Sequence, residues 1–460
     1  MPAIDDFATW EPLLRLLREG DAESLAAPGG HVAGRIGRHG WSMRLPRRFP
    51  PPGRALQTED MRDEKVAVQQ VRSALEQTGI EDLSFVAEIS PTGRTVLYLL
   101  DTGPAVESGL GPYPGSLVLV EGSVPEPWRR LPDPAPEAVP APSADLDLLK
   151  RTLEDHFDGV PGATDAEIAA AEQRLGVALP EEIKVLYRVV GPRGLEWNAD
   201  FAAAERFYEA VRCEVFPLEE VYIAHAASRP CPWRFAAMEA VSTPSDAAVQ
   251  GVVGSPGWIV FGDSGGGDRI AVDLTPGPRG HAGQIIMLSH ERSIGADLLA
   301  DSLTEFMTDR DAHADDTRHD DELPAVARVN VRSLTNIEAA VHPRLEVLSI
   351  GVWEDDPLSL APVIGLPRLR TLTACAGTLA DPLQIAELKG LEFLELGSDE
   401  WRRLLDARAV PRSLSAAAIE VPAREPHPLP IVDLANDILA LWDRPPITRT
   451  VLEGDLAPAT

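Results

Sequence analysis

A serine in a glycine-rich run is the residue of this chain that comes closest to a reactive nucleophile. Ser264 stands in the sequence Gly-Asp-Ser-Gly-Gly, and a histidine, His225, precedes it by 39 positions. Hydrolases use a serine activated by a histidine and an aspartate for nucleophilic attack. So short a separation leaves no room for an aspartate on a strand of its own, and a turn that needs positive φ explains the glycines better. We therefore expect a hairpin turn here and keep a hydrolase using Ser264 as the last alternative.

Other reactive patterns are missing from the sequence. The three glycines 265–267 are not followed by the Lys and Ser or Thr of a phosphate-binding loop, and no HExxH or HxH occurs. Neighbouring carboxylates such as Glu181 and Glu182 do not face one cleft and suit the start of a helix. The three cysteines form no CxxC pair, which argues against a thiolate metal site and a secreted disulfide framework. We predict a protein that is not an enzyme, with no catalytic residue, no cofactor and no metal.

Charge narrows the kinds of partner. The 460 residues carry a formal net charge of −30, which repels nucleic acid and anionic membranes and attracts basic partners. Asp5 and Asp6 stand where a signal peptide would need lysine or arginine, and no apolar run of about 18 residues appears. We expect a cytoplasmic protein that binds neither nucleic acid nor membrane; its oligomeric state stays open.

Two stretches of unusual composition predict a multi-domain α+β protein with three folded parts. Seven prolines within 123–143 favour an extended linker, and 310–322 is too polar to bury a core. The predicted order is an N-terminal α/β domain at 1–122, a proline-rich linker at 123–143, an α+β domain at 144–309, an acidic linker at 310–322, a repeat region with a helical cap at 323–445, and a tail at 446–460.

The N-terminal domain combines helix and strand patterns. Trp10, Leu13, Leu14 and Leu17 fall on one helical face, and a second helix is expected over 64–77. Strands are expected over 83–89 and 95–100, on either side of a Ser-Pro-Thr-Gly turn, with another over 117–120.

An arginine cluster in the same domain contrasts with the acidic chain. No Asp or Glu occurs from His31 to Arg54. The cluster suits either an anionic partner or the acidic domains of this same protein, and both interpretations stay open. Its arginines are Arg35, Arg38, Arg44, Arg47, Arg48 and Arg54.

The middle domain opens with two helices and continues with short strands. Thr164 and Glu167 have the spacing of a capping box, and Pro180 suits the first turn of the next helix. Strands are expected over 257–262, 269–273 and 283–288, and a last helix over 298–307. Aspartates 263 and 268 would hold the first hairpin through Asx turns.

Five of these segments, in this order, resemble the SUKH superfamily, which includes the yeast cell-wall assembly and killer-toxin-resistance regulator and many bacterial immunity proteins. The segments are Thr164-Asp-Ala-Glu-Ile, Leu175-Gly-Val-Ala-Leu-Pro-Glu-Glu182, Trp258-Ile-Val-Phe-Gly-Asp263 with Gly267-Asp268, Asp273-Leu-Thr-Pro-Gly277, and Asp301-Ser-Leu-Thr-Glu-Phe306. The resemblance covers roughly residues 146–309. It implies an α+β fold that binds protein partners near the central hairpin.

A repeat occupies the C-terminal third. LxxLxL-like motifs begin at Leu345, Leu369, Leu391 and Leu414, which lie 24, 22 and 23 residues apart. This period is typical of a short leucine-rich-repeat solenoid, whose strands expose the intervening positions on a concave sheet. A helix over 431–442 would cap its open end.

The resemblance and the charge together predict a non-catalytic protein-binding protein, of the immunity type, that captures a basic toxin domain. A regulatory scaffold without a toxin partner is the alternative. The candidate partner-binding residues are Glu346, Ser349, Arg370, Thr373, Glu392, Phe393, Glu395, Trp258, Asp263 and Asp268.

Overall fold

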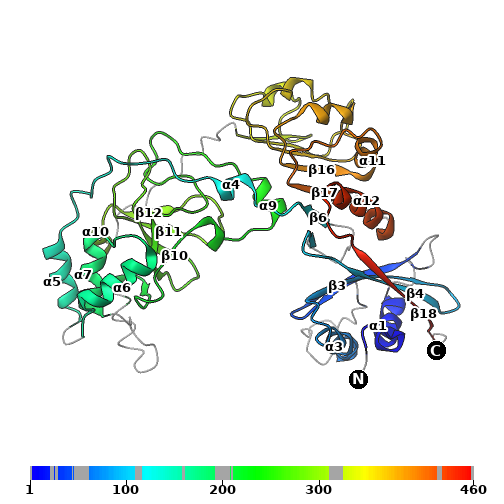
Figure 1. Ribbon diagram of the computed structural model, residues 1–460, viewed down its shortest axis with the longest axis horizontal. Helices are drawn as coiled ribbons and strands as arrows, with labels where there is room; N and C mark the ends of the chain where they lie inside the picture. Colours follow the sequence, from blue (N-terminus) through cyan, green and yellow to red (C-terminus); the bar gives the residue numbers. More distant parts are fainter. Residues whose placement is uncertain are drawn as a thin grey trace, which may run out of the picture. The chain divides into compact units, whose positions relative to one another are not determined.

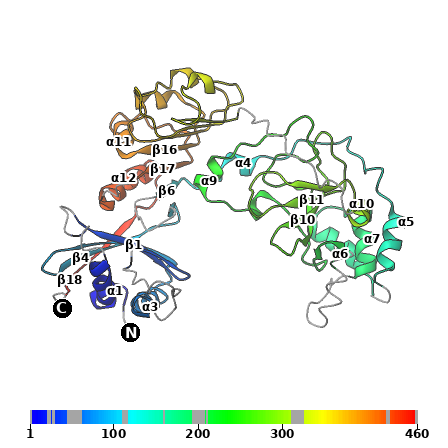
Figure 2. The same ribbon diagram turned by 180° about the vertical axis from the view of Figure 1, so that it is seen from behind.

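The computed structural model describes residues 3–20, 25, 30–43, 45, 62–108, 117–157, 161–191, 208, 211–309, 325–421 and 427–456. Two compact units arise, one from Met1–Ser123 with Pro324–Thr460 and one from Val124–Leu323 (Figures 1 and 2). The two outer segments, predicted as separate domains, share a hydrophobic core in which Val86 and Leu100 belong to the same cluster as Leu348. The predicted acidic linker, 310–322, lies outside the described residues.

A five-stranded antiparallel sheet with two helices forms the N-terminal part of the first unit. Trp10 and Leu14 of helix α1 pack with Phe85 of the sheet, as the helical spacing predicts. Gly93, at φ +98°, closes the expected turn between strands β3 and β4. The elements are α1 (Phe7–Gly20), β1 (Val32–Gly37), β2 (Trp41–Met43), α3 (Arg62–Leu75), β3 (Asp82–Ile89), β4 (Arg94–Asp101) and, at the sheet edge beside β4, β18 (Thr448–Asp455).

Strand β18 comes from the segment that the sequence suggests is a tail. It pairs antiparallel with β4 from Thr448 opposite Asp101 to Asp455 opposite Arg94. Its side chains are mostly exposed, so an apolar pattern could not reveal the strand. The backbone of β4 supplies the partner that makes this polar segment a strand.

A seven-stranded sheet holds the repeat region. Strands β13 to β17 are parallel, and Leu348, Leu372 and Leu394 are neighbours along one row of the sheet. The row extends beyond the last repeat, because β17 pairs antiparallel with β6, a strand predicted for the N-terminal domain. The strands are β13 (Val326–Val329), β14 (Val347–Ile350), β15 (Thr371–Ala374), β16 (Phe393–Gly397), β17 (Ala416–Glu420), β6 (Leu117–Val120) and β5 (Val106–Ser108).

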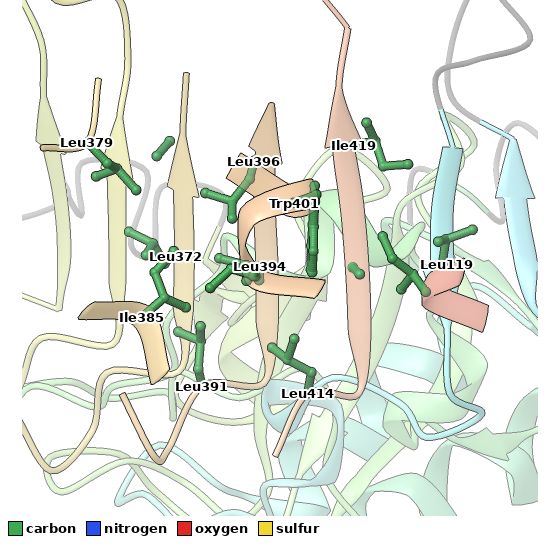
Figure 3. Packing of buried hydrophobic residues seen from close by; sticks show 14 of the residues in the cluster. Leu119, Leu372, Leu379, Ile385, Leu391, Leu394, Leu396, Trp401, Leu414 and Ile419 are labelled. Carbon is green, nitrogen blue, oxygen red and sulfur yellow. The ribbon is translucent and has the colours of Figure 1, made fainter. Parts of the chain in front are cut away.

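Short helical segments return the chain from each parallel strand to the next. Figure 3 shows Leu394 and Leu396 of β16 beside Trp401 of helix α11, and Ile385 near Leu372. Helix α12, expected as a cap, packs on β17, β6 and α11. Because β6 also pairs with β17, a strand and a helix together close this end of the core. The segments are η3 (Glu338–Ala340), η4 (Ala361–Val363), η5 (Pro382–Glu387), α11 (Ser398–Asp406) and α12 (Pro428–Leu441).

The second unit is built on an antiparallel sheet in the order β12-β11-β10-β9-β7, with β8 also paired to β9. Ile259 and Phe261 of β9 lie in the cluster that contains the helices, whereas Trp258 and Val260 lie in the cluster on the opposite face. Its strands are β7 (Glu214–Val215), β8 (Tyr222–Ile223), β9 (Trp258–Asp263), β10 (Arg269–Asp273), β11 (Gln284–Leu288) and β12 (Asp297–Ala300). Its helices are α4 (Glu126–Arg129), α5 (Leu146–Glu154), α6 (Asp165–Leu175), α7 (Glu181–Val190), η2 (Ala226–Ser228), α9 (Trp233–Ala237) and α10 (Leu303–Thr308).

The predicted capping box is present at the start of α6. The Thr164 hydroxyl accepts a hydrogen bond from the Glu167 backbone N–H, and the Glu167 carboxylate accepts one from the Thr164 backbone N–H. Gly176, at φ +72°, ends the helix in the left-handed region that glycine adopts without strain. Local sequence signals therefore determine both ends of this helix.

The proline-rich segment 123–143 was expected to be a linker, and the structure instead packs most of it against the second unit. The Asp133 backbone N–H donates to the Gln250 side chain (2.7 Å), which in turn donates to the Asp133 carbonyl (2.8 Å). Farther on, the Ala282 N–H donates to the Val139 carbonyl. Because extended proline-rich backbone makes no internal hydrogen bonds, its polar groups are available to a neighbouring surface.

Candidate functional site

The turn between β9 and β10, residues 263–269, is called the hairpin tip. Gly265 and Gly267 adopt φ of +80° and +99°, a conformation that favours glycine. Asp263 Oδ1 accepts a hydrogen bond from the Gly265 N–H at 2.7 Å, which is the Asx turn expected from the sequence. The Ser264 N–H donates to the Asp268 carbonyl at 2.9 Å. These bonds hold an exposed loop in one backbone conformation.

Asp268 is held by a histidine that the sequence interpretation missed. Its Oδ1 accepts hydrogen bonds from the backbone N–H of His290 at 2.9 Å and from the ring Nδ1 at 2.8 Å. These two bonds, the backbone one foremost, lower the pKa of Asp268 below its usual value. His290 lies in the loop after β11 and its side chain is 57% exposed. Only the loop's position beside the tip, which no sequence spacing encodes, could have identified it.

The hairpin tip is acidic. The second oxygen of Asp263 pairs with Arg269, whose guanidinium also lies over the Phe216 ring at 5.6 Å from its centroid. Glu214 of β7 lies opposite Asp263 in the sheet, so three carboxylates, with Asp268, accompany one arginine. Asp263 itself is only 8% exposed, so the structure makes it a residue that holds the turn rather than the contact residue expected. Such a rigid acidic turn suits contact with a basic surface.

Ser264 and His225 are not arranged for nucleophilic catalysis. His225 follows β8, whose Ile223 lies opposite Ile259 near the start of β9, whereas Ser264 follows the end of that strand. A strand advances about 3.3 Å per residue, so β9 separates the two side chains by about 20 Å. The Ser264 hydroxyl instead accepts a hydrogen bond from the Gly266 N–H. The geometry contradicts the triad that a Ser264 hydrolase would need.

Trp258, a candidate partner-binding residue, is fully buried. Its side chain lies in the hydrophobic cluster on the sheet face opposite the helices, with Val260 and Ile286. The structure therefore makes Trp258 a core residue, because its strand position points it inward.

The candidate residues of the repeat strands are also mostly buried, contrary to the exposed concave surface expected of them. Phe393 is fully buried, and Glu346 and Arg370 are 1% and 2% exposed. Thr373 and Ser349 are joined by a hydrogen bond of 2.9 Å between their hydroxyls. Glu392 and Glu395 are 6% exposed. The alternation of the strands predicted which face each residue lies on, but it could not predict that this face is covered.

Glu346, Arg370 and Glu392 form a buried charge cluster. Each of them stands one position before a strand, β14, β15 and β16 respectively. Arg370 Nε lies 3.4 Å from Glu346 Oε2, and Arg370 Nη1 lies 3.9 Å from Glu392 Oε2. Their backbones are also linked, because the Arg370 N–H donates to the Glu346 carbonyl and the Glu392 N–H to the Arg370 carbonyl. The sequence spacing of the repeats aligns the three residues, and Arg370 lies between the two carboxylates, with Arg368 at 4.0 Å from Glu346 as a second cation.

The arginine cluster is described only in part. Arg35 pairs with Asp82 of β3 at 2.6 Å, so one member makes the intramolecular contact that was left open. Arg38 lies in the loop between β1 and β2 and makes no ion pair within the described residues. Arg44, Arg47, Arg48 and Arg54 lie outside the described residues.

Two further acids are buried, and the sequence interpretation had assigned Glu182 only to the start of its own helix. The Glu182 carboxylate accepts hydrogen bonds from the backbone N–H groups of Leu303 and Thr304 and so caps α10. Asp273 accepts from Thr275 and from the Gln284 side chain, and burial raises the pKa of Asp273 to about 6. Both acids lie in segments that carried the resemblance, but their partners lie far along the chain or across strands.

No helix in the part of the chain that the structure describes is both long and apolar enough to cross a membrane. Among the same described residues, no group of three or more His, Cys, Asp or Glu side chains could hold a metal ion.

The second unit is an α+β domain with an antiparallel sheet, helices on one face and an acidic turn at one end. Residues 162–309 match the SMI1/KNR4 family (SUKH-1), which confirms the resemblance for this part of the chain. The family includes glucan synthesis regulators and immunity proteins. A glucan synthesis regulatory protein of Neurospora crassa is 38% identical over 66 residues, which are 14% of this chain and 12% of that protein's length.

Proposed function

We propose that this chain is a non-catalytic protein-binding protein of the immunity type, which captures a toxin domain with a basic surface through the hairpin tip. The observation that carries the proposal is the tip itself, where Asp268 and Glu214 lie beside exposed glycines and the buried Asp263 holds the turn, within the SUKH-1 region. A turn already held in one conformation loses little entropy on binding. The net charge of −30 would speed association with a basic partner.

Gly266 offers a test that leaves the tip folded. It has no positive φ, and a Cβ there would approach nothing closer than Ser264 Oγ at 3.6 Å. We compare Gly266→Lys with Gly266→Gln, which adds a side chain of similar length without charge. Binding to the product of a toxin gene adjacent to this chain's own gene is measured by surface plasmon resonance. We expect Gly266→Lys to weaken binding by about tenfold or more and Gly266→Gln to weaken it far less.

Ionic strength provides the second arm of the test. Electrostatic association slows as salt increases, because the Debye length falls to about 3 Å at 1 M salt. Tight binding that ignores both salt and Gly266→Lys would contradict the role of the tip. The absence of any toxin gene beside this one would favour the second candidate.

The second candidate is an intracellular regulatory scaffold without a toxin partner. The match to a glucan synthesis regulatory protein favours it, although that match spans only 12% of the relative. Affinity purification from the native cell distinguishes the two, since a scaffold would co-purify with several cellular proteins at comparable amounts. An immunity protein would co-purify with one toxin in a fixed ratio.

The repeat region, in this proposal, is a leucine-rich-repeat-like support rather than an open docking surface. The parallel pairing of strands β14 to β17 and the leucine row support the repeat interpretation. The burial of Glu346, Arg370 and Phe393 supports the structural role. We also retain a cytoplasmic location in the proposal, because the chain has only three cysteines and no CxxC pair.

A further inference from the structure

A hollow of about 340 Å³ lies at the loop between β1 and β2, in the first unit. Arg35, Arg38, His39, Gly40 and Trp41 are among the residues that line it. Its volume is within the range of small-molecule sites. This arginine pocket is separate from the hairpin tip and plays no part in the function proposed above.

The backbone holds the pocket's arginines in place. The Arg38 N–H donates to the Glu81 carbonyl at 3.0 Å, and the Gly37 N–H to the Gly40 carbonyl at 2.9 Å. Arg72 of α3 donates from its guanidinium to the Arg38 carbonyl. Arg35 and Arg38 line this pocket, whereas Arg72 lines an adjoining hollow that shares Trp41.

Positive charge exceeds negative charge when the pocket is taken together with the adjoining hollow, which shares Trp41 and is lined by Lys65 and Arg72. Asp82 lines the hollow but pairs with Arg35, and it can do so because residue 37 is glycine. A Cβ on Gly37 would lie 2.1 Å from Asp82 Oδ1. Neither Arg38 nor Arg72 makes an ion pair with any residue that the structure describes. The carboxylates of Glu81 and Asp82 equal in number the two arginines that line the pocket, and Lys65 and Arg72 of the adjoining hollow supply the excess positive charge.

The same three arginines carry enclosed donors without acceptors. The Nε atoms of Arg35, Arg38 and Arg72 are buried and make no hydrogen bond. An enclosed donor without a partner is costly, and native proteins leave few of them. These enclosed atoms are not themselves accessible to a ligand, but the guanidinium groups of Arg38 and Arg72, which make no ion pair with a described residue, favour an oxygen-rich anion beside them.

We propose that the arginine pocket binds a small phosphate-bearing ligand. A phosphate offers several acceptor oxygens, and the planar fork of a guanidinium matches two of them at once. Trp41 also lines an adjoining hollow of about 600 Å³ with Lys65 and Arg72, so there is space and an aromatic ring for a body attached to the phosphate. A mononucleotide is the simplest ligand of this kind. The net charge of −30 disfavours a nucleic acid.

Gly40 allows a test that alters no arginine. It lines the pocket, and a Cβ on it would meet nothing within 4 Å, so a side chain there does not disturb packing. Gly40→Asp places a carboxylate at the rim, and Gly40→Asn places a neutral side chain of the same shape. We titrate the full-length chain and both variants with inorganic phosphate and with ADP by isothermal titration calorimetry at low ionic strength.

We expect the unmodified chain to bind, Gly40→Asn to bind similarly, and Gly40→Asp to bind about tenfold or more weakly. Tighter binding of ADP than of phosphate would show that the ligand's body uses the hollow beside Trp41. Equal affinities for ADP and phosphate would show that the pocket recognises only the phosphate group. Both results support the proposal.

Arginine variants give the second measurement. Arg38→Gln should weaken binding of phosphate and ADP about tenfold. The affinity of Arg38→Lys should lie between those of the unmodified chain and Arg38→Gln, because lysine keeps the charge but lacks the forked donors of the guanidinium. Arg94→Gln is the matched control, since Arg94 is an exposed arginine of the same sheet that pairs with Glu453 at 3.7 Å. The proposal is overturned if neither phosphate nor ADP binds at millimolar concentration, if Gly40→Asp or Arg38→Gln binds as well as the unmodified chain, or if only an oligonucleotide binds.

Discussion

Carboxylates lie beside arginines both in the repeat strands and at the hairpin tip, but the two regions treat them differently. In the repeat strands, Glu346 and Arg370 are almost wholly buried and pair with each other. At the tip, Asp268 bonds to His290, whose side chain is 57% exposed. The same residue types thus serve packing in the buried repeat strands and hold an open turn at the tip. Residue type alone therefore does not identify a binding surface.

The largest expected effect comes from Phe393→Ala. Phe393 was a candidate contact residue, but its side chain is fully buried. Removing a buried phenylalanine costs about 3–5 kcal/mol of unfolding free energy, measured by denaturant unfolding of the full chain. If Phe393→Ala keeps its stability but loses partner binding, the repeat strands would be a binding surface rather than a structural core.

Arg370→Ala should lower the free energy of unfolding by about 3 kcal/mol, because it leaves the carboxylates of Glu346 and Glu392 buried without this cation. Arg370→Met, which fills similar volume, is the control for lost packing. Thermal and denaturant unfolding measure both variants. If Arg370→Ala is as stable as the unmodified chain, the cluster is not structural and the repeat strands become candidates for binding again.

Two aspartates of the second unit should respond to pH in opposite directions. The pKa of Asp268 is lowered in the folded state, so its contribution to stability is present above the unfolded value of 3.8 and is lost as pH falls through the folded value. The pKa of Asp273 is raised to about 6 from 3.8, so its contribution is full below 3.8 and is lost as pH rises through about 6.

Carboxyl chemical shifts followed by NMR from pH 2 to 8 would measure both titrations. Asp268→Asn and Asp273→Asn assign the two signals. Titration of Asp273 at the ordinary aspartate value would contradict its burial, and an Asp268 pKa at or above that value would contradict the bonds from His290.

The smallest expected effect is that of Ser264→Ala. The Ser264 hydroxyl accepts one hydrogen bond within an exposed turn, so its loss should change stability by less than about 1 kcal/mol. A serine-reactive fluorophosphonate probe should not label the unmodified chain. Labelling that disappears in Ser264→Ala would mean that the tip is a catalytic site and not a docking surface.

Much of the local structure was predictable. The helix of Trp10 and Leu14, the capping box of Thr164 and Glu167 and the turn at Asp263 appear where residue types and spacing indicate them. The candidate site was predictable only in part. Asp263 and Asp268 belong to the tip, but His290 approaches it from another loop, and no local pattern connects the two.

Amino-acid order alone determined the helix ends, the hairpin glycines and the spacing that aligns the repeat strands, because each depends on residues a few positions apart. Tertiary structure decided that β18 pairs with β4, that β6 extends the repeat sheet, and that the proline-rich segment packs against Gln250. Backbone groups of any sequence can hydrogen-bond, so an unpaired edge or an extended segment takes its partner from whatever the fold brings beside it.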